Sequence, residues 1–308
     1  MTTTPPRPLD ITAVFPALAP HARTAVRLHP APAHPAVPGP HESSIGGPLA
    51  WPSAEPHPTC PGGRHLFAEE HPGPSPLLPV LQVHARDVPW YDGFPEGTDV
   101  LQLLWCPFQH AYDTPGAPYN GIAGPWVRLL HRCAADLDGS LPLPPTDAEG
   151  HDYRPVPCSL RPEPVTEYPH PGLLGEEFEE RVDAWQQATF PEPDAQNDPD
   201  DPDDDPEYES RYHWDLSTAP GWKLGGHEPW NYQGYFGPVR CHTCDTPMRF
   251  VAALASAEFD GGTASWAPAP DGVRAPQCPT TVRLGGFETM RVFACPRSPD
   301  HPVHSDLV

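Results

Sequence analysis

Proline is the residue that most limits how this chain can fold, because it accounts for 50 of the 308 residues. It lacks a backbone N–H and is excluded from helix interiors and central strands, which disfavours long helices and a regular doubly wound sheet. The chain nevertheless contains nine Trp, nine Tyr and eleven Phe, and disordered chains are poor in such residues. We therefore predict an α+β, mainly β fold with short strands and long proline-rich loops.

The charge of the chain narrows the range of partners. Its formal net charge is −23, from 41 Asp and Glu residues against 18 Lys and Arg residues. Binding to phosphate groups requires clustered Lys and Arg, so we expect neither nucleic acid nor an anionic membrane as a partner. A basic protein or peptide is the partner that this charge favours. The alternative is that the acidic residues serve only solubility.

Two features of the sequence indicate the cellular compartment of the protein. The chain has no run of about 18 apolar residues that could span a membrane. Residues 1–20 lack the basic start and apolar stretch of a secretory signal, so we expect a cytoplasmic protein. In a reducing compartment the eight cysteines are more often metal ligands or buried thiols than disulfides.

Apolar runs of strand length, bounded by Gly, Pro or Asp, recur along the chain and are typical of a packed sheet. They predict strands at 24–28, 77–85, 99–106, 126–132, 153–160, 164–168, 248–257 and 289–294. A short helix is predicted at 10–18. A second, acidic amphipathic helix is predicted at 175–189, where Leu174, Phe178 and Val182 recur every four residues and share one face.

The second helix and the acidic block that follows it at 191–210 are rich in Asp and Glu. Together they hold fifteen of the 41 acidic residues, between Glu176 and Glu209, and such acidic stretches usually remain solvated. We interpret 173–210 as an acidic helix and linker. It would join a first domain at 1–172, including an N-terminal extension, to a second domain at 211–308.

Three landmarks occur in the same order in both domains. The first is an aliphatic residue, a Gly-Gly pair and, after three more residues, a Trp, at 45–51 and at 224–230. The second is an apolar strand after Pro76 and after Pro247, and the third is a strand that ends in Cys-Pro, at Cys106 and at Cys295. We interpret the pattern as a duplicated short-stranded β domain. The Gly pairs would permit turns, because neither has the context of a phosphate-binding loop.

The segment Cys241-His242-Thr243-Cys244 has the C-x2-C spacing that lets two thiolates face one tetrahedral ion. Cys295 ends a later strand, with His301 close behind it. We predict a zinc site made of Cys241, Cys244, Cys295 and His301. Four protein ligands would make the site closed and therefore structural rather than catalytic. The alternatives are a redox pair, which normally needs a βαβ context, or buried free thiols.

The first domain holds a second, weaker candidate metal site. Its residues would be Cys60, His65 or His71, Cys106 and His110. The repeat motivates this assignment, since Cys106-Pro107 matches Cys295-Pro296. The alternative is a buried cysteine beside surface histidines.

No catalytic residue can be assigned, because the sequence has neither a G-x-S-x-G elbow nor an H-E-x-x-H motif. An open zinc site would be the exception, since zinc with three protein ligands can activate water. Tryptophan is a favoured anchor in binding sites. We take Trp51, Trp230 and Gln82 as candidate binding residues.

Six segments resemble actinobacterial members of the YwqG-like group, which is related to the eukaryotic programmed cell death protein 2 family. They are SSIGGPLAWP, VLQVHARDVP, GTDVLQLLWCPFQH, APGWKLGGHEPW, CHTCDTPMRF and RVFACPRSPDH, and they span about residues 43–304. The resemblance implies a duplicated α+β or mainly β domain. It also implies a chaperone-like role, because the eukaryotic relatives are dedicated chaperones of a basic ribosomal protein. Their further zinc finger is not found here, and Leu81-Gln82 is replaced by Ala252-Ala253 in the second domain.

The function that these features predict is a non-enzymatic, zinc-stabilised interaction module, chaperone-like, that binds a basic protein or peptide. One alternative is a metal-dependent hydrolase with an open zinc site. Another is an immunity protein that neutralises a basic toxin.

Overall fold

The computed structural model describes residues 4–33, 36–62, 65–66, 73–110, 124–144, 152–190, 211–229, 238–269 and 275–308. Strands predominate over helices among them. Every strand pairing in these segments is antiparallel. The mainly β fold is therefore confirmed. The acidic block at 191–210, Trp230 and His71 lie outside the described residues.

One sheet has six strands in the order β11-β1-β12-β13-β14-β15. Their bounds are Glu163–Glu167 (β11), Arg23–Arg27 (β1), Lys223–Gly225 (β12), Arg249–Ala255 (β13), Thr289–Ala294 (β14) and His304–Leu307 (β15). Two of these strands, β1 and β11, come from the part of the chain before residue 172 and yet share a sheet with strands after residue 211.

The other large sheet has seven strands in the order β2-β10-β3-β6-β7-β5, with β8 also paired to β7. Their bounds are Ala31–Pro32 (β2), Cys158–Ser159 (β10), Ser44–Ile45 (β3), Leu78–His84 (β6), Val100–His110 (β7), His65–Leu66 (β5) and Gly124–Arg132 (β8). A separate pair consists of Leu49–Trp51 (β4) and Gly139–Leu141 (β9).

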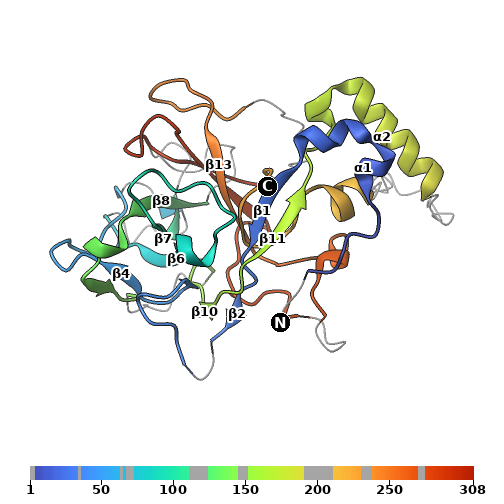
Figure 1. Ribbon diagram of the computed structural model, residues 1–308. Helices are drawn as coiled ribbons and strands as arrows, with labels where there is room; N and C mark the ends of the chain where they lie inside the picture. The colour runs from blue at the N-terminus through green and yellow to red at the C-terminus, as the bar shows by residue number, and fades with distance from the viewer. Residues whose placement is uncertain are drawn as a thin grey trace.

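A two-stranded ribbon connects the two sheets (Figure 1). One side of the ribbon runs from β1 into β2, and the other runs from β10 into β11. At one end β1 also pairs with β12 of the six-stranded sheet. At the other end β10 also pairs with β3 of the seven-stranded sheet. The ribbon therefore supplies strands to both sheets: β1 pairs next to β12 in one, and β10 pairs next to β3 in the other.

The main core contains side chains from both sheets, so the two sheets share one interior. Trp105 of β7 and Trp222, which precedes β12, belong to this core, with ring centroids 6.4 Å apart. The indole N–H of Trp105 donates to the carbonyl of Tyr153 at 2.7 Å, and that of Trp222 donates to the carbonyl of Ala255 at 2.8 Å. Both rings thus contribute large buried apolar area while their polar atoms are satisfied.

The helices form a second core beside the six-stranded sheet (Figure 1). Helix α2 (Glu176–Thr189) matches the prediction and buries Phe178 and Val182. Helix α1 is shorter than predicted: it spans Ile11–Val14, and Pro16–His21 is a 3-10 helix. A proline disfavours helical geometry in the residue before it, here Phe15. Other 3-10 helices are Ala85–Asp87, Ala134–Asp136, Pro171–Leu174 and Ala264–Trp266, and Tyr212–Ser217 is a π-helix. Within the described segments, no helix has both the length and the apolar character to cross a membrane.

A fully buried ion pair joins the ribbon to the second Gly-Gly segment. The ammonium of Lys223 donates to the carboxylate of Glu167 at 2.6 Å, and both side chains have no exposed area. Glu167 also accepts hydrogen bonds from the backbone N–H groups of Ala219 and His227, at 2.7 and 2.8 Å. Gly226 has φ of 74°, and a Cβ atom there would clash with the Glu167 carboxylate, which explains this glycine.

Replacing Lys223 with methionine is expected to lower the free energy of unfolding by about 3–5 kcal/mol, because the Glu167 carboxylate would stay buried without its cation. Arg86→Met is the control, since the Arg86–Asp87 pair is exposed and should change stability by no more than about 0.5 kcal/mol. Urea unfolding measures both values. A loss at Lys223 no larger than that of the control would contradict the prediction.

Candidate metal centres

Four side chains of the second predicted site converge and are called here the second cluster: Cys241, Cys244, Cys295 and His301. Their ligand atoms all lie within 4.8 Å of one another. The sulfur of Cys295 is 3.6 Å from that of Cys244 and 3.3 Å from Nδ1 of His301. The sulfur of Cys241 is 3.5 Å from the same nitrogen. The turn before β13, the end of β14 and the loop before β15 supply these residues.

The turn that carries Cys241 and Cys244 is held by its own backbone. A bridge between Arg240 and Pro247 closes it, and the N–H of Cys241 donates to the carbonyl of Thr246 at 3.0 Å. The hydroxyl of Thr246 lies 3.4 Å from the sulfur of Cys244. This contact lowers the pKa of Cys244 to about 6. The turn therefore favours the thiolate, the form in which cysteine binds a metal ion.

The first predicted site also converges, and we call it the first cluster: Cys60, His65, Cys106 and His110. All four side chains are buried, with ligand atoms within 4.8 Å of one another. Nε2 of His65 is 3.6 Å from the sulfur atoms of both cysteines. His65 of β5 pairs directly with His110 of β7, and their rings lie 4.5 Å apart. Of the two histidines considered for this position, the structure thus brings His65 into the cluster.

The first cluster concentrates negative charge in a buried place. Contact with Cys106 lowers the pKa of Cys60 to about 3, and the same contact raises the pKa of Cys106. The backbone N–H of Ser75 donates to the Cys60 sulfur at 3.2 Å and also favours a thiolate. Both ring nitrogens of His110 are buried, and this ring interacts with the Cys60 sulfur in a way that also lowers the pKa of the thiol. A bound cation would satisfy the thiolate and this ring together.

The geometry of both clusters fits a tetrahedral metal ion. Zinc bond lengths of about 2.3 Å to sulfur and about 2.0–2.1 Å to nitrogen imply ligand separations of about 3.6 Å for S–N and about 3.8 Å for S–S. The observed S–N distances are 3.3 to 3.6 Å, and the one S–S distance quoted above is 3.6 Å. All eight cysteines are free. Both clusters could hold a metal ion.

Two of the predicted binding residues lie in the interior. Trp51 is 3% exposed, and the guanidinium of Arg132 stacks 4.3 Å from the centre of a Trp51 ring. Gln82 has no exposed area: its Oε1 accepts from the N–H of Ala50 at 2.9 Å, and its Nε2 donates to the carbonyl of Pro40 at 2.7 Å. Both side chains therefore stabilise the fold from within. Their role in binding a partner stays a prediction, as does that of Trp230.

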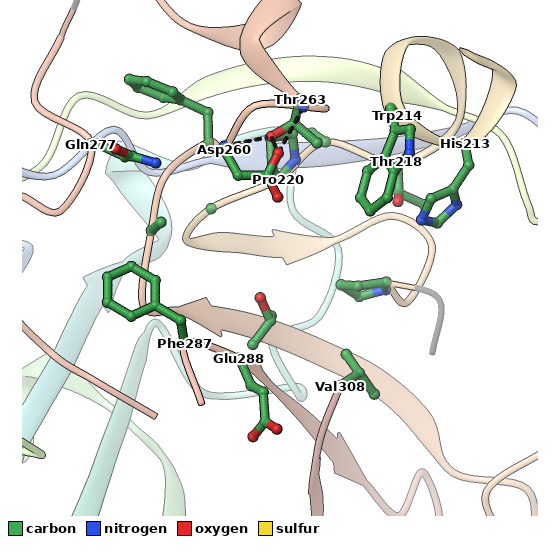
Figure 2. A pocket seen from close by; sticks show the side chains of 16 residues that line it. His213, Trp214, Thr218, Pro220, Asp260, Thr263, Gln277, Phe287, Glu288 and Val308 are labelled. Carbon is green, nitrogen blue, oxygen red and sulfur yellow. Dashed lines mark hydrogen bonds between the residues drawn. The ribbon is translucent and has the colours of Figure 1, made fainter. Parts of the chain in front are cut away.

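Other residues offer more accessible surface. A cavity of about 240 Å³ adjoins Cys295 and His301 of the second cluster, with Tyr91 and Phe94 on its wall. Another, of about 310 Å³, is lined by Trp214 and Phe287 together with Asp260 (Figure 2). Trp214 belongs to a group of aromatic residues, a few of which the sequence predicts to line a groove. Asp260 and Phe287 could not be singled out, because the surrounding FDGG and LGGF segments are typical of ordinary turns.

Comparison with known family models and with curated proteins gives no match for this chain. The similarity to the YwqG-like group therefore rests on the six sequence segments alone. The function has to be argued from the two clusters, the charge and the surface.

Proposed function

We propose that this chain is a zinc-stabilised protein-interaction module, chaperone-like, that binds a basic protein or peptide. The observation that carries the proposal is the pair of Cys/His clusters, each with four ligand atoms supplied by the chain itself. Zinc with four protein ligands has no open position for water or substrate and stabilises a fold instead. The same observation counts against a metal-dependent hydrolase, which needs an open coordination position.

We further infer that the chain is a duplication with exchanged strands, in keeping with a YwqG-like protein. Support comes from strand registers that correspond between the two sheets. The pair Ile45↔Leu81 in the seven-stranded sheet corresponds to Leu224↔Ala252 in the six-stranded sheet. In the same way Leu78↔Trp105 corresponds to Arg249↔Ala294. The bridge Thr59↔Pro76 corresponds to the bridge Arg240↔Pro247. An irregularity of register falls between Pro79 and Leu81 in one sheet and between Phe250 and Ala252 in the other. Such irregularities are specific features of a sheet rather than accidents.

The two clusters occupy corresponding places in this scheme. Cys60 follows Thr59 and Cys241 follows Arg240, and these two preceding residues begin the corresponding bridges. Cys106 follows Trp105 and Cys295 follows Ala294, which are corresponding residues of β7 and β14. The ribbon strands β1 and β10 correspond as well, and each joins the sheet of the other repeat. In this arrangement α2 and the acidic block are an insertion within the second repeat, after its ribbon strand, rather than a linker between repeats.

The proposed partner follows from charge. A net charge of −23 attracts a basic protein and accelerates its association, in a manner that salt weakens. An immunity protein against a basic toxin would use the same attraction, so the identity of the captured partner distinguishes it from a chaperone.

Capture experiments test the proposal. The immobilised full chain is expected to retain a protein of isoelectric point above about 9 from lysate at about 50 mM salt and to release it at about 500 mM. An unrelated folded protein of the same net charge is the control for simple ion exchange. The retained protein is then purified and titrated against the chain. The proposal fails if everything retained by the chain is also retained by the control.

A further inference from the structure

One surface cavity lies apart from both metal clusters, and we call it the Trp214–Phe287 pocket. Its volume is about 310 Å³, at the small end of the range of about 300–1,000 Å³ for ligand sites. Figure 2 shows Trp214 and Phe287 on opposite sides, with Asp260 and Thr263 between them. The pocket therefore has room for one long side chain and carries an aromatic ring on each of two walls.

The pocket is acidic. Asp260 and Glu288 belong to its wall, and the described residues that line it include neither Lys nor Arg. Oδ1 of Asp260 accepts from the backbone N–H and from the hydroxyl of Thr263, both at 2.8 Å, and these bonds fix the direction of the carboxylate. Burial lowers the pKa of His213 on the opposite wall to about 4, so this ring adds no positive charge at neutral pH.

A third carboxyl group lies directly behind the wall, and burial raises its pKa to about 7. Glu258 is 5% exposed, and its Oε1 accepts from the N–H of Trp222 at 2.9 Å. Its Oε2 is buried and has no hydrogen-bond partner among the described residues. Gly221, which lines the pocket with φ of 85°, separates this oxygen from the cavity, and a Cβ atom there would lie only 2.7 Å from it. The glycine thus leaves an unpaired acceptor next to the pocket wall.

The two aromatic rings are held in place. Trp214 packs against Gly262, where a Cβ atom would lie 3.0 Å from the indole. Phe287 is 47% exposed although its φ is 91°, a strained geometry for a residue other than glycine that tends to occur at functional sites. The guanidinium carbon of Arg283 already lies 5.5 Å from the centre of the Phe287 ring, and the planar guanidinium group stacks on aromatic faces better than an ammonium group does.

We propose that the Trp214–Phe287 pocket binds the guanidinium group of an arginine side chain of the partner protein. This inference rests on the proposed function, because it gives the basic partner its point of attachment. The guanidinium stacks on the indole of Trp214 and its N–H groups donate to the carboxylate of Asp260, while the aliphatic part of the arginine side chain passes over Phe287. Such a charged, planar pair is directional, whereas the net charge alone attracts any basic surface.

A peptide with a single arginine tests the pocket. The ¹⁵N-labelled full chain is titrated with acetyl-Gly-Ser-Arg-Ser-Gly-amide at about 150 mM salt, and the indole N–H signal of Trp214, assigned with Trp214→Phe, is followed. We expect a saturable shift of this signal and none at Trp90, which is exposed elsewhere. A peptide with neutral citrulline in place of arginine should bind at least about 10-fold more weakly. A peptide with lysine in that place should bind with an affinity between those of the other two peptides.

Two variants locate the binding. Asp260→Asn and Phe287→Ala should each weaken binding of the arginine peptide by about 5–20-fold, while the exposed controls Glu96→Gln and Phe190→Ala leave it unchanged. Equal binding of the arginine and citrulline peptides, or equal behaviour of the variants and controls, overturns the inference. If the chain still captures a specific basic partner in that case, the proposed function survives. If the pocket binds arginine but no specific partner is captured, only the proposed function fails.

Discussion

Replacing Cys106 with serine is expected to empty the first cluster and to lower the free energy of unfolding by about 3–6 kcal/mol, part of the about 10–16 kcal/mol that a structural zinc contributes in small zinc-finger domains. Cys106 is fully buried on β7, and its loss would leave Cys60, His65 and His110 buried without a complete ligand set. Cys241→Ser should likewise empty the second cluster. Urea unfolding and elemental analysis measure the two effects.

The control for these variants is Cys158→Ser. Cys158 is also fully buried and lies outside both clusters, so it separates the loss of a buried thiol from the loss of a ligand. We expect about two zinc ions per wild-type chain, about one in each ligand variant and about two in Cys158→Ser. Removal of the metal with a chelator should lower the melting temperature of the wild type. Purified protein without metal would disprove the zinc assignment.

The ligands were the part of this protein most open to prediction from sequence. Cys241 and Cys244 are separated by two residues, and this spacing alone indicates a metal. Cys106 and Cys295 could be found because the same Cys-Pro pair follows an apolar run in both places, although β7 continues past Cys106 to His110. The weakest assignment was His65, because its place opposite His110 depends on a two-residue strand, which is too short to leave a periodic pattern.

The exchange of ribbon strands could not be predicted in the same way. The short apolar runs at 24–28 and 164–168 indicate that strands are present, but pairing between residues 25 and 225 is a property of the whole fold. For the same reason the burial of Gln82 could not be predicted. Every side chain of β6 is buried, so this strand lacks the alternation that would mark an outward position, and buried strands are common inside shared cores.

Acid is expected to unfold this protein over a defined range, because stability should fall as the pH drops from about 6.5 to about 4. Burial lowers the pKa of His29, His213 and His227 to about 4 and that of His170 to about 3. In the unfolded chain each ring binds a proton near pH 6.5, whereas the folded protein resists protonation until about pH 4. Within this range the unfolded state binds more protons, and each histidine removes up to about 1.4 kcal/mol of stability per pH unit.

Two buried carboxyl groups act in the opposite direction, because burial raises the pKa of both Glu167 and Glu258. Burial raises the pKa of Glu258 to about 7, so the folded protein holds an extra proton between about pH 4.5 and 7 and gains stability as the pH falls through that range. Four histidines outweigh these two carboxyl groups, and the net effect is a loss of up to about 3 kcal/mol per pH unit between pH 6 and 5.

Urea unfolding at pH 7, 6 and 5 tests this balance. His227→Gln keeps a donor for the carbonyl of His21, which lies 2.8 Å from Nε2 of His227, but it removes one titrating ring. We expect this variant to lose less stability than the wild type between pH 6 and 5, by up to about 1.4 kcal/mol. His41→Gln, at an exposed histidine, should keep the wild-type dependence. Stability that stays level or increases towards pH 5 in the wild type would mean that these rings are protonated in the folded protein, and hence that the interior around His29 and His227 admits water.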